Sequence, residues 1–235
     1  MICPFYCDLF FRPIVLKCMI EEHHIQTTRT ARYHSLGSLE SEISEVWYVL
    51  HGYGQRAEDF LKNFLPIANE SILVIAPEAL SRFYVKGFAG DVGASWMTRE
   101  DRMSEIQDYV RYLDNLYAEV GFMLKKPPQK IIALGFSQGS PAVLRWQSEG
   151  NSPVNEIVVW SGDVPRDLAF AKFKSNTEKS RKWLVNSPND EFISKEIYTE
   201  SQNLFLNNEI PFVTMNFDGG HKIPDVSLKE LRSKF

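Results

Sequence analysis

A serine flanked by glycines follows an apolar run in the second half of the chain. In GFSQG, Ser137 lies between Gly135 and Gly139, after the β-rich run at 130–134 and before a helix-like stretch at 138–150. A sharp strand-to-helix turn of this kind presents a serine hydroxyl for attack on a carbonyl carbon. The pattern alone also fits an ordinary glycine-rich turn, but its flanks favour a nucleophilic Ser137.

A serine hydroxyl needs a base within hydrogen-bonding distance, and the chain has five histidines. His221 lies in NFDGGHKIP, where two glycines after a strand-like run would leave its imidazole exposed. His51 also ends a strand-like run, and we interpret it as a structural turn residue. His23 and His24 lie beside glutamates near the start of the chain, and His34 ends an edge strand. The sequence therefore predicts His221 as the base, the alternative being a turn histidine.

An acid that orients this base is expected between the serine and the histidine. Asp190 follows a strand-like run in LVNSPNDEF, and the chain order serine, acid, histidine is one that catalytic triads use. The alternative is that Asp190 only caps a helix that begins near Glu191.

Two backbone N–H groups are needed to stabilise the negative charge that develops on the carbonyl oxygen. One should follow the nucleophile, at Gln138. The other is expected from the turn YVLHGYGQ, where the N–H of Tyr53 is the best candidate. The neighbouring glycines allow a close approach of the backbone.

The elements that would position these residues alternate between apolar strands and amphipathic helices. A period-two run at 24–36 predicts an edge strand or strand pair. Buried strands are predicted at 45–50, 71–77, 130–136, 156–162, 181–187 and 211–217, and helices at 58–69, 99–120, 138–150, 191–208 and 226–235. This alternation predicts an α/β fold with a mostly parallel central sheet and helices on both faces. Ligands of such sheets bind beyond the carboxyl ends of the strands, where the candidate residues fall.

Composition excludes other classes of protein. The chain has 235 residues, of which 44% are hydrophobic and 24% charged, with a net charge of −4. These values are typical of a single globular domain and not of a basic nucleic-acid-binding protein. The sequence carries no metal-ligand cluster or nucleotide-binding loop, so we expect neither a metal nor a cofactor.

The first 18 residues differ from the rest of the chain. They are apolar and aromatic, but prolines and charges divide them into pieces too short to span a bilayer, and they lack the pattern of a secretory signal. We expect translation to begin at Met19 and a single domain to cover 19–235; a divergent signal or an anchor is the alternative. All three cysteines (Cys3, Cys7 and Cys18) lie in this segment, so a reducing cytoplasm is the simpler location.

The motifs together resemble those of a known family. LHGYGQRAEDF, APEA, GASWM, GFSQGS, SG, PND and GGH occur in the order of the phospholipase/carboxylesterase family of α/β-hydrolases, which includes the acyl-protein thioesterases. The resemblance runs from about Glu45 to the C-terminus. It implies the α/β-hydrolase fold and the hydrolysis of carboxylic esters or thioesters through an acyl-enzyme on Ser137. It also implies His221 as base, Asp190 as acid, and the amides of Tyr53 and Gln138 as the oxyanion hole.

Three positions depart from the family pattern. Ser187 occupies a position that is often glycine, and Tyr53 one that is often aliphatic. Asp163, in SGDVP, stands where an uncharged residue is expected. Because Asp163 also follows a strand and precedes His221, chain order does not separate it from Asp190 as the acid.

The segment 80–97 is long for a connection, and such segments are usually functional. Its large side chains would wall a substrate pocket or, alternatively, fill the core beneath it: Phe83, Tyr84, Phe88, Trp96 and Met97. The predicted partner is a small ester or thioester. A peptidase or amidase with the same triad, or a non-catalytic protein on a hydrolase scaffold, remains open, as do the acyl-chain preference and the oligomeric state.

Overall fold

The computed structural model of the protein describes residues 20–235. The chain divides into two units, Met1–Thr30 and Ala31–Phe235. The described part of the first unit, 20–30, is exposed and forms neither helix nor strand. The predictions for 1–18 lie outside the described residues. The second unit carries all of the helices and strands described below.

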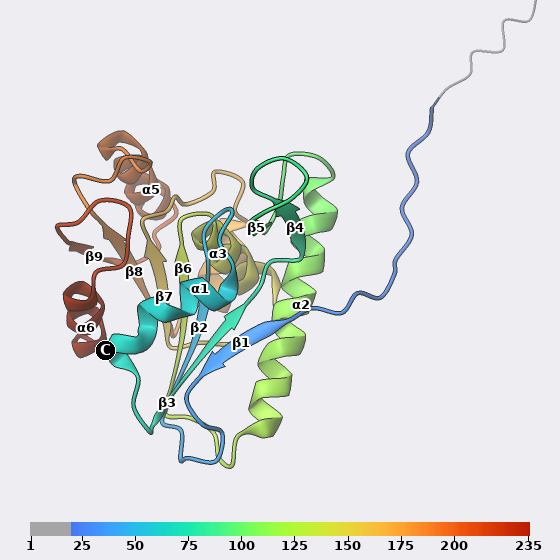
Figure 1. The fold of residues 1–235 in the computed structure, drawn as a ribbon. Helices are drawn as coiled ribbons and strands as arrows, with labels where there is room; N and C mark the ends of the chain where they lie inside the picture. Colours follow the sequence, from blue (N-terminus) through green and yellow to red (C-terminus); the bar gives the residue numbers. More distant parts are fainter. Residues whose placement is uncertain (1–19) are drawn as a thin grey trace, which may run out of the picture. The chain divides into compact units, whose positions relative to one another are not determined.

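A seven-stranded sheet forms the centre of the second unit (Figure 1), in the order β1-β3-β2-β6-β7-β8-β9. Its strands are β1 Tyr33–Leu36, β2 Glu45–Leu50, β3 Ile72–Pro77, β6 Lys130–Phe136, β7 Glu156–Trp160, β8 Arg181–Asn186 and β9 Val213–Asn216. The edge strand β1 runs antiparallel to β3, and the other neighbours in this sheet pair in parallel. The predicted, mostly parallel α/β sheet is therefore confirmed.

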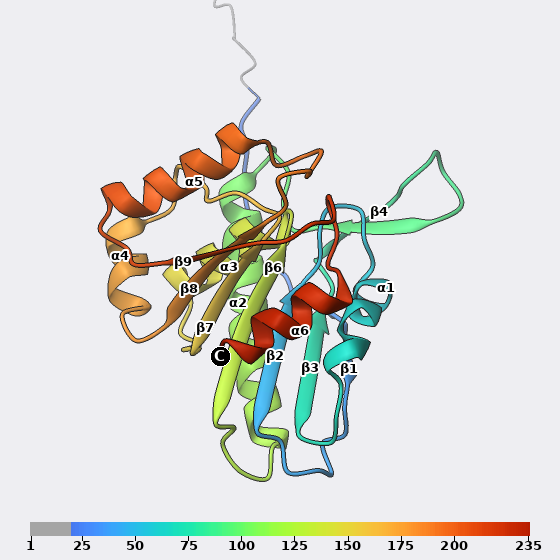
Figure 2. The ribbon, with the colours of Figure 1, turned by 90° about the vertical axis from the view of Figure 1, so that its left-hand side faces the viewer.

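Helices cover both faces of the sheet (Figure 2). They are α1 Ala57–Leu61, the 3₁₀ helix η1 Lys62–Ile67, α2 Arg102–Met123, α3 Gly139–Glu149, α4 Phe170–Asn176, α5 Lys195–Asn207 and α6 Asp225–Ser233. Side chains of α2, α3, α4 and α5 belong to one hydrophobic cluster with the sheet, and those of α1, η1 and α6 belong to a second. Within 20–235, no helix is long and apolar enough to cross a membrane.

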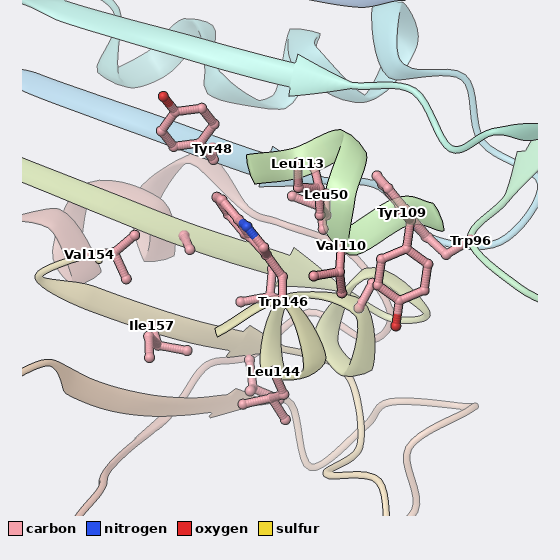
Figure 3. Packing of buried hydrophobic residues seen from close by; sticks show 14 of the residues in the cluster. Tyr48, Leu50, Trp96, Tyr109, Val110, Leu113, Leu144, Trp146, Val154 and Ile157 are labelled. Atoms are coloured by element: carbon pink, nitrogen blue, oxygen red, sulfur yellow. The ribbon is translucent and has the colours of Figure 1, made fainter. Parts of the chain in front are cut away.

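Alternation along β2 shows why both faces are covered. Tyr48 and Leu50 belong to the first cluster, whereas Trp47 and Val49 belong to the second, because successive side chains of a strand point to opposite faces. In the first cluster the rings of Tyr48 and Trp146 meet edge to face at 5.6 Å (Figure 3). Burial of each such side chain contributes roughly 1.5–3 kcal/mol, so this central strand is held firmly in place.

Four parts of the fold differ from the sequence predictions. The period-two run at 24–36 forms a strand only over Tyr33–Leu36. The predicted helix 58–69 is a short α-helix followed by a 3₁₀ helix that contains Pro66, which cannot donate an α-helical hydrogen bond. The helix predicted from Glu191 begins at Lys195. Helix α4, at Phe170–Asn176, was not predicted.

The segment 80–97 is also more ordered than a loop. It contains an antiparallel hairpin of β4 Ser81–Tyr84 and β5 Val92–Ser95. Figure 2 shows this hairpin extending away from the central sheet. Its turn brings the end of β5 back to the carboxyl end of the sheet, where it meets the loop after β2 through the hydrogen bond from the N–H of Gly54 to the carbonyl of Ala94 (2.9 Å).

Candidate active site

Ser137 occupies a strained turn between β6 and α3. Its φ is 53°, in the left-handed region that non-glycine residues rarely adopt. The turn is held from two sides: the Ser137 N–H donates to the carbonyl of Trp160 at 3.0 Å, and the N–H of Ser140 donates to the carbonyl of Ser137 at 2.9 Å. The strand–turn–helix context predicted for this serine is therefore present, at the carboxyl end of a central strand.

Glycines let neighbouring backbones approach this turn. A Cβ on Gly139 would lie 2.1 Å from the carbonyl oxygen of Leu50, so only glycine lets the start of α3 pack against the end of β2. A Cβ on Gly52 would lie 3.2 Å from the Cβ of Ser137. The loop after β2, which carries Tyr53, thus passes directly beside the serine.

Asp190 and His221 are in direct contact. Both carboxylate oxygens of Asp190 lie 2.9 Å from Nδ1 of His221, and the carboxylate side chain is fully buried. Burial alone would raise the pKa of Asp190, but hydrogen bonds from the N–H of Ile193, from His221 and from the N–H of Phe192 outweigh it and lower that pKa. The ionised carboxylate fixes the proton of the imidazole on Nδ1 and leaves Nε2 as the acceptor.

The imidazole of His221 lies between two phenylalanine rings. Its centroid is 4.8 Å from the ring of Phe136, the residue before the serine, and 4.7 Å from the ring of Phe192, which meets it edge to face. The fold thus brings residues from the ends of β6, β8 and β9 to one place. Phe192 is not among the residues predicted from the sequence, although an aromatic residue two positions after the predicted acid is a signal for one.

Asp163 has different surroundings. It is exposed on the loop after β7, whereas the carboxylate that contacts His221 is that of Asp190. Nor does Asp190 cap α5: the N-cap is Ser194, whose side chain accepts from the N–H of Ile197. Geometry therefore favours Asp190 over Asp163 as the partner of the imidazole.

The loop after β2 is held by the buried side chain of His51. Nδ1 of His51 donates to the carbonyl of Gly52 at 2.7 Å, and Nε2 accepts from the N–H of Ala79 at 3.1 Å. Burial lowers the pKa of His51, and the Gly52 carbonyl and the charge of Glu78 offset only part of this effect. His51 is therefore a neutral structural residue, as its position in the turn suggested.

The side chain of Gln138 clamps the segment after β5. Its Oε1 accepts from the N–H of Trp96 at 3.1 Å, and its Nε2 donates to the carbonyl of Met97 at 3.0 Å and to Oγ of Ser95 at 3.1 Å. Only the backbone amide of Gln138 was considered from the sequence. These hydrogen bonds join the serine turn to the hairpin segment. They thereby fix the orientation of the backbone N–H of Gln138.

The five side chains expected to wall a pocket lie in different environments. Phe83 is half-buried and stacks on the exposed ring of Tyr53 at 5.2 Å. Met97 is half-buried, and Tyr84 is exposed on β4.

For two of the five, the structure does not support a pocket wall. Trp96 is buried in the core, where its indole N–H donates to the carbonyl of His51 at 2.9 Å, so the core-filling alternative describes it. Phe88 is 99% exposed in the turn between β4 and β5 and extends into solvent. Within 31–235, no three His, Cys, Asp or Glu side chains bring ligand atoms close enough together to hold a metal ion.

Comparison with known proteins identifies the fold. No family model matches the chain, and no curated protein matches it by sequence. Solved structures do match: esterase PE8 has a TM-score of 0.68 at 20% identity, with 88% of this chain and 98% of that chain covered. A Mesorhizobium loti carboxylesterase has a TM-score of 0.69 at 17% identity, covering 87% and 93%. Zea mays acyl-protein thioesterase 2 has a TM-score of 0.62 at 19% identity, covering 87% and 97%. The protein therefore has the α/β-hydrolase fold.

Proposed function

We propose that this protein is a serine hydrolase that cleaves carboxylic esters or thioesters through an acyl-enzyme on Ser137. The observation that carries the proposal is the contact of His221 Nδ1 with the buried carboxylate of Asp190. The same imidazole packs on Phe136, the residue before the serine in the strained strand-to-helix turn. The fold that the chain shares with solved structures named carboxylesterase and acyl-protein thioesterase supports the same reaction class.

In the first half of the reaction, Oγ of Ser137 attacks the carbonyl carbon while Nε2 of His221 takes its proton. The ionised Asp190 stabilises the imidazolium that forms. His221 then donates the proton to the departing alcohol or thiol, and the acyl group stays on the serine. In the second half, His221 activates a water molecule that releases the acid and restores the serine.

The oxyanion that forms in each half is stabilised by two backbone amides. The N–H of Gln138 lies at the start of α3, where the helix dipole adds positive potential. The N–H of Tyr53 lies on the loop that passes beside Ser137. His51 and the Gln138 side chain fix the loops around these amides, so the two N–H groups need little reorientation during the reaction. Donors that are oriented in advance stabilise a developing negative charge most effectively.

Substrate contacts are assigned to the aromatic pair beside the oxyanion loop. The stacked rings of Tyr53 and Phe83 offer apolar surface at the oxyanion loop, and Phe192 offers it beside His221. We assign this surface to the acyl and leaving groups of a small ester or thioester. We also propose a cytoplasmic location, since residues 19–235 contain no cysteine for a stabilising disulfide.

The test is steady-state hydrolysis of esters, thioesters and amides of graded chain length by the wild-type protein and by Ser137→Ala. We expect turnover of esters and thioesters that falls below about 1% of wild type in the variant, because loss of a triad nucleophile costs several powers of ten. Faster cleavage of amides than of esters would favour a peptidase, and no turnover of any substrate would favour a non-catalytic binding protein.

A further inference from the structure

The loops that carry Asp190 and His221 leave neighbouring strands and then lose the ladder of hydrogen bonds between them. Strands β8 and β9 pair in parallel up to Asn186 and Asn216, and the N–H of Phe217 makes one more bond to the carbonyl of Asn186, at 3.1 Å. Beyond this point, regular pairing no longer fixes the distance between the acid and the base.

The hydroxyl oxygen of Ser187, the first residue after β8, joins the two loops. It accepts from the N–H of Gly220 at 3.0 Å and from the N–H of Asn189 at 3.2 Å. Gly220 directly precedes His221, and Asn189 directly precedes Asp190. A single oxygen therefore holds the backbone one residue before the base and one residue before the acid.

The acceptor in this link is more buried than the acceptors of two other polar contacts between the loops. Ser187 is fully buried, whereas Nδ2 of Asn189 donates to Asp218 in an exposed contact at 3.1 Å, and the N–H of His221 donates to Glu191 in another at 3.2 Å. Loss of the Ser187 hydroxyl would remove the one acceptor that ties the part-buried N–H groups of Asn189 and Gly220 together, at a cost in free energy.

We propose that Ser187 is a positioning residue whose hydroxyl sets the contact between Asp190 and His221. This inference rests on the proposed hydrolase function and deepens it. The role belongs to this chain's own sequence, because the glycine that the family resemblance often places here would supply no acceptor. Ser187 acts through the two backbones, so its loss should affect the chemical step and leave substrate binding unchanged.

The first experiment compares Ser187→Ala with Ser201→Ala in p-nitrophenyl acetate hydrolysis. Ser201 is a matched control: it is also buried, and its Oγ also accepts from a backbone N–H, that of Val164, at 3.0 Å. We expect Ser187→Ala to lower kcat on the order of tenfold, with KM unchanged, and Ser201→Ala to leave both near wild type. Equal kcat values in the two variants would overturn the proposal. So would an effect of Ser187→Ala that is confined to a higher KM.

A second readout does not require turnover. The proton that His221 shares with Asp190 gives a proton NMR resonance far downfield of the amides, which is assigned by its loss in His221→Asn. We expect this resonance to broaden or move in Ser187→Ala and to persist in Ser201→Ala; an unchanged resonance in Ser187→Ala would overturn the proposal. If the wild type shows the resonance but no turnover, the proposed function fails, while the effect of Ser187 on this resonance still decides the positioning role.

A third variant covers the case in which Ser187→Ala does not fold. Ser187→Cys keeps nearly the same shape but replaces the hydroxyl with a weak acceptor. We expect it to fold, as judged by its circular dichroism and Tm, and to show the same changes in kcat and in the resonance. Wild-type kcat and an unchanged resonance in Ser187→Cys would contradict the role of the hydroxyl.

Discussion

Nδ1 of His221 lies 2.9 Å from each carboxylate oxygen of Asp190, and that carboxylate is fully buried. An acid in this position holds the imidazole in one tautomer, whereas an asparagine amide favours the wrong one. In serine proteases with such a triad, the aspartate-to-asparagine substitution lowers kcat about 10⁴-fold. We predict that Asp190→Asn lowers kcat at least ~10²-fold.

Asp163→Asn is the matched control for that substitution, because it makes the same chemical change at an exposed aspartate after the neighbouring strand β7. We predict a loss of less than ~10-fold in kcat for this variant. The opposite ranking of the two variants would assign the acid to Asp163, and small effects from both would contradict the triad as a whole.

The buried imidazole of His51 predicts how stability depends on pH. Burial lowers its pKa in the folded protein, so the unfolded chain binds the extra proton. The contribution of His51 to the free energy of unfolding is fully present above the unfolded pKa of about 6.5 and is lost as the pH falls below it. The free energy of unfolding then changes by at most ~1.4 kcal/mol per pH unit. Urea unfolding of the wild type between about pH 5 and pH 8 measures the slope. His51→Asn does not titrate there, and the same slope in both proteins would refute the explanation.

Trp96 and Phe83 should respond differently to truncation. Trp96 is in the core, so Trp96→Ala should lower the free energy of unfolding by about 3–5 kcal/mol. Phe83 stacks beside the oxyanion loop, so Phe83→Ala should instead weaken the preference for longer acyl chains by up to ~0.8 kcal/mol per methylene contacted. Kinetics with esters of graded length measure this preference, and the exposed Phe88→Ala is the control. Equal changes in preference for Phe83→Ala and Phe88→Ala would contradict the assignment.

Removal of residues 1–18 should leave a folded, active protein. The sheet, both hydrophobic clusters and every candidate catalytic residue lie within 31–235. Thermal unfolding and ester hydrolysis of the shortened chain, compared with the full chain, check this expectation. Aggregation or a large fall in Tm would mean that the segment packs on the domain.

The predictable parts of this protein are those whose signal is local in sequence. The strands that end at Leu50, Phe136 and Trp160 are apolar on both faces and stand out as continuous runs. The strained turn at Ser137 needs glycines two residues before and two residues after the serine, so the five residues 135–139 are enough to predict the nucleophile.

The parts that escaped prediction depend on contacts between distant segments. The hairpin strand Ser81–Tyr84 has four residues, of which the first two are polar, so it lacks an apolar run. The hydrogen bond from Gly220 to Ser187 joins residues 33 positions apart, and the clamp from Gln138 to Met97 joins residues 41 apart. No local pattern encodes such pairs. They are formed by the packing of the sheet.

Covalent modification by a fluorophosphonate probe shows directly whether Ser137 is an activated nucleophile, because only an activated serine attacks the phosphorus. The wild-type protein is treated with the probe, digested and analysed by mass spectrometry, with Ser137→Ala and His221→Ala treated in parallel. We predict stoichiometric modification of the peptide that contains Ser137 in the wild type, and none in either variant. An unmodified wild-type protein, or modification at a different residue, would contradict it.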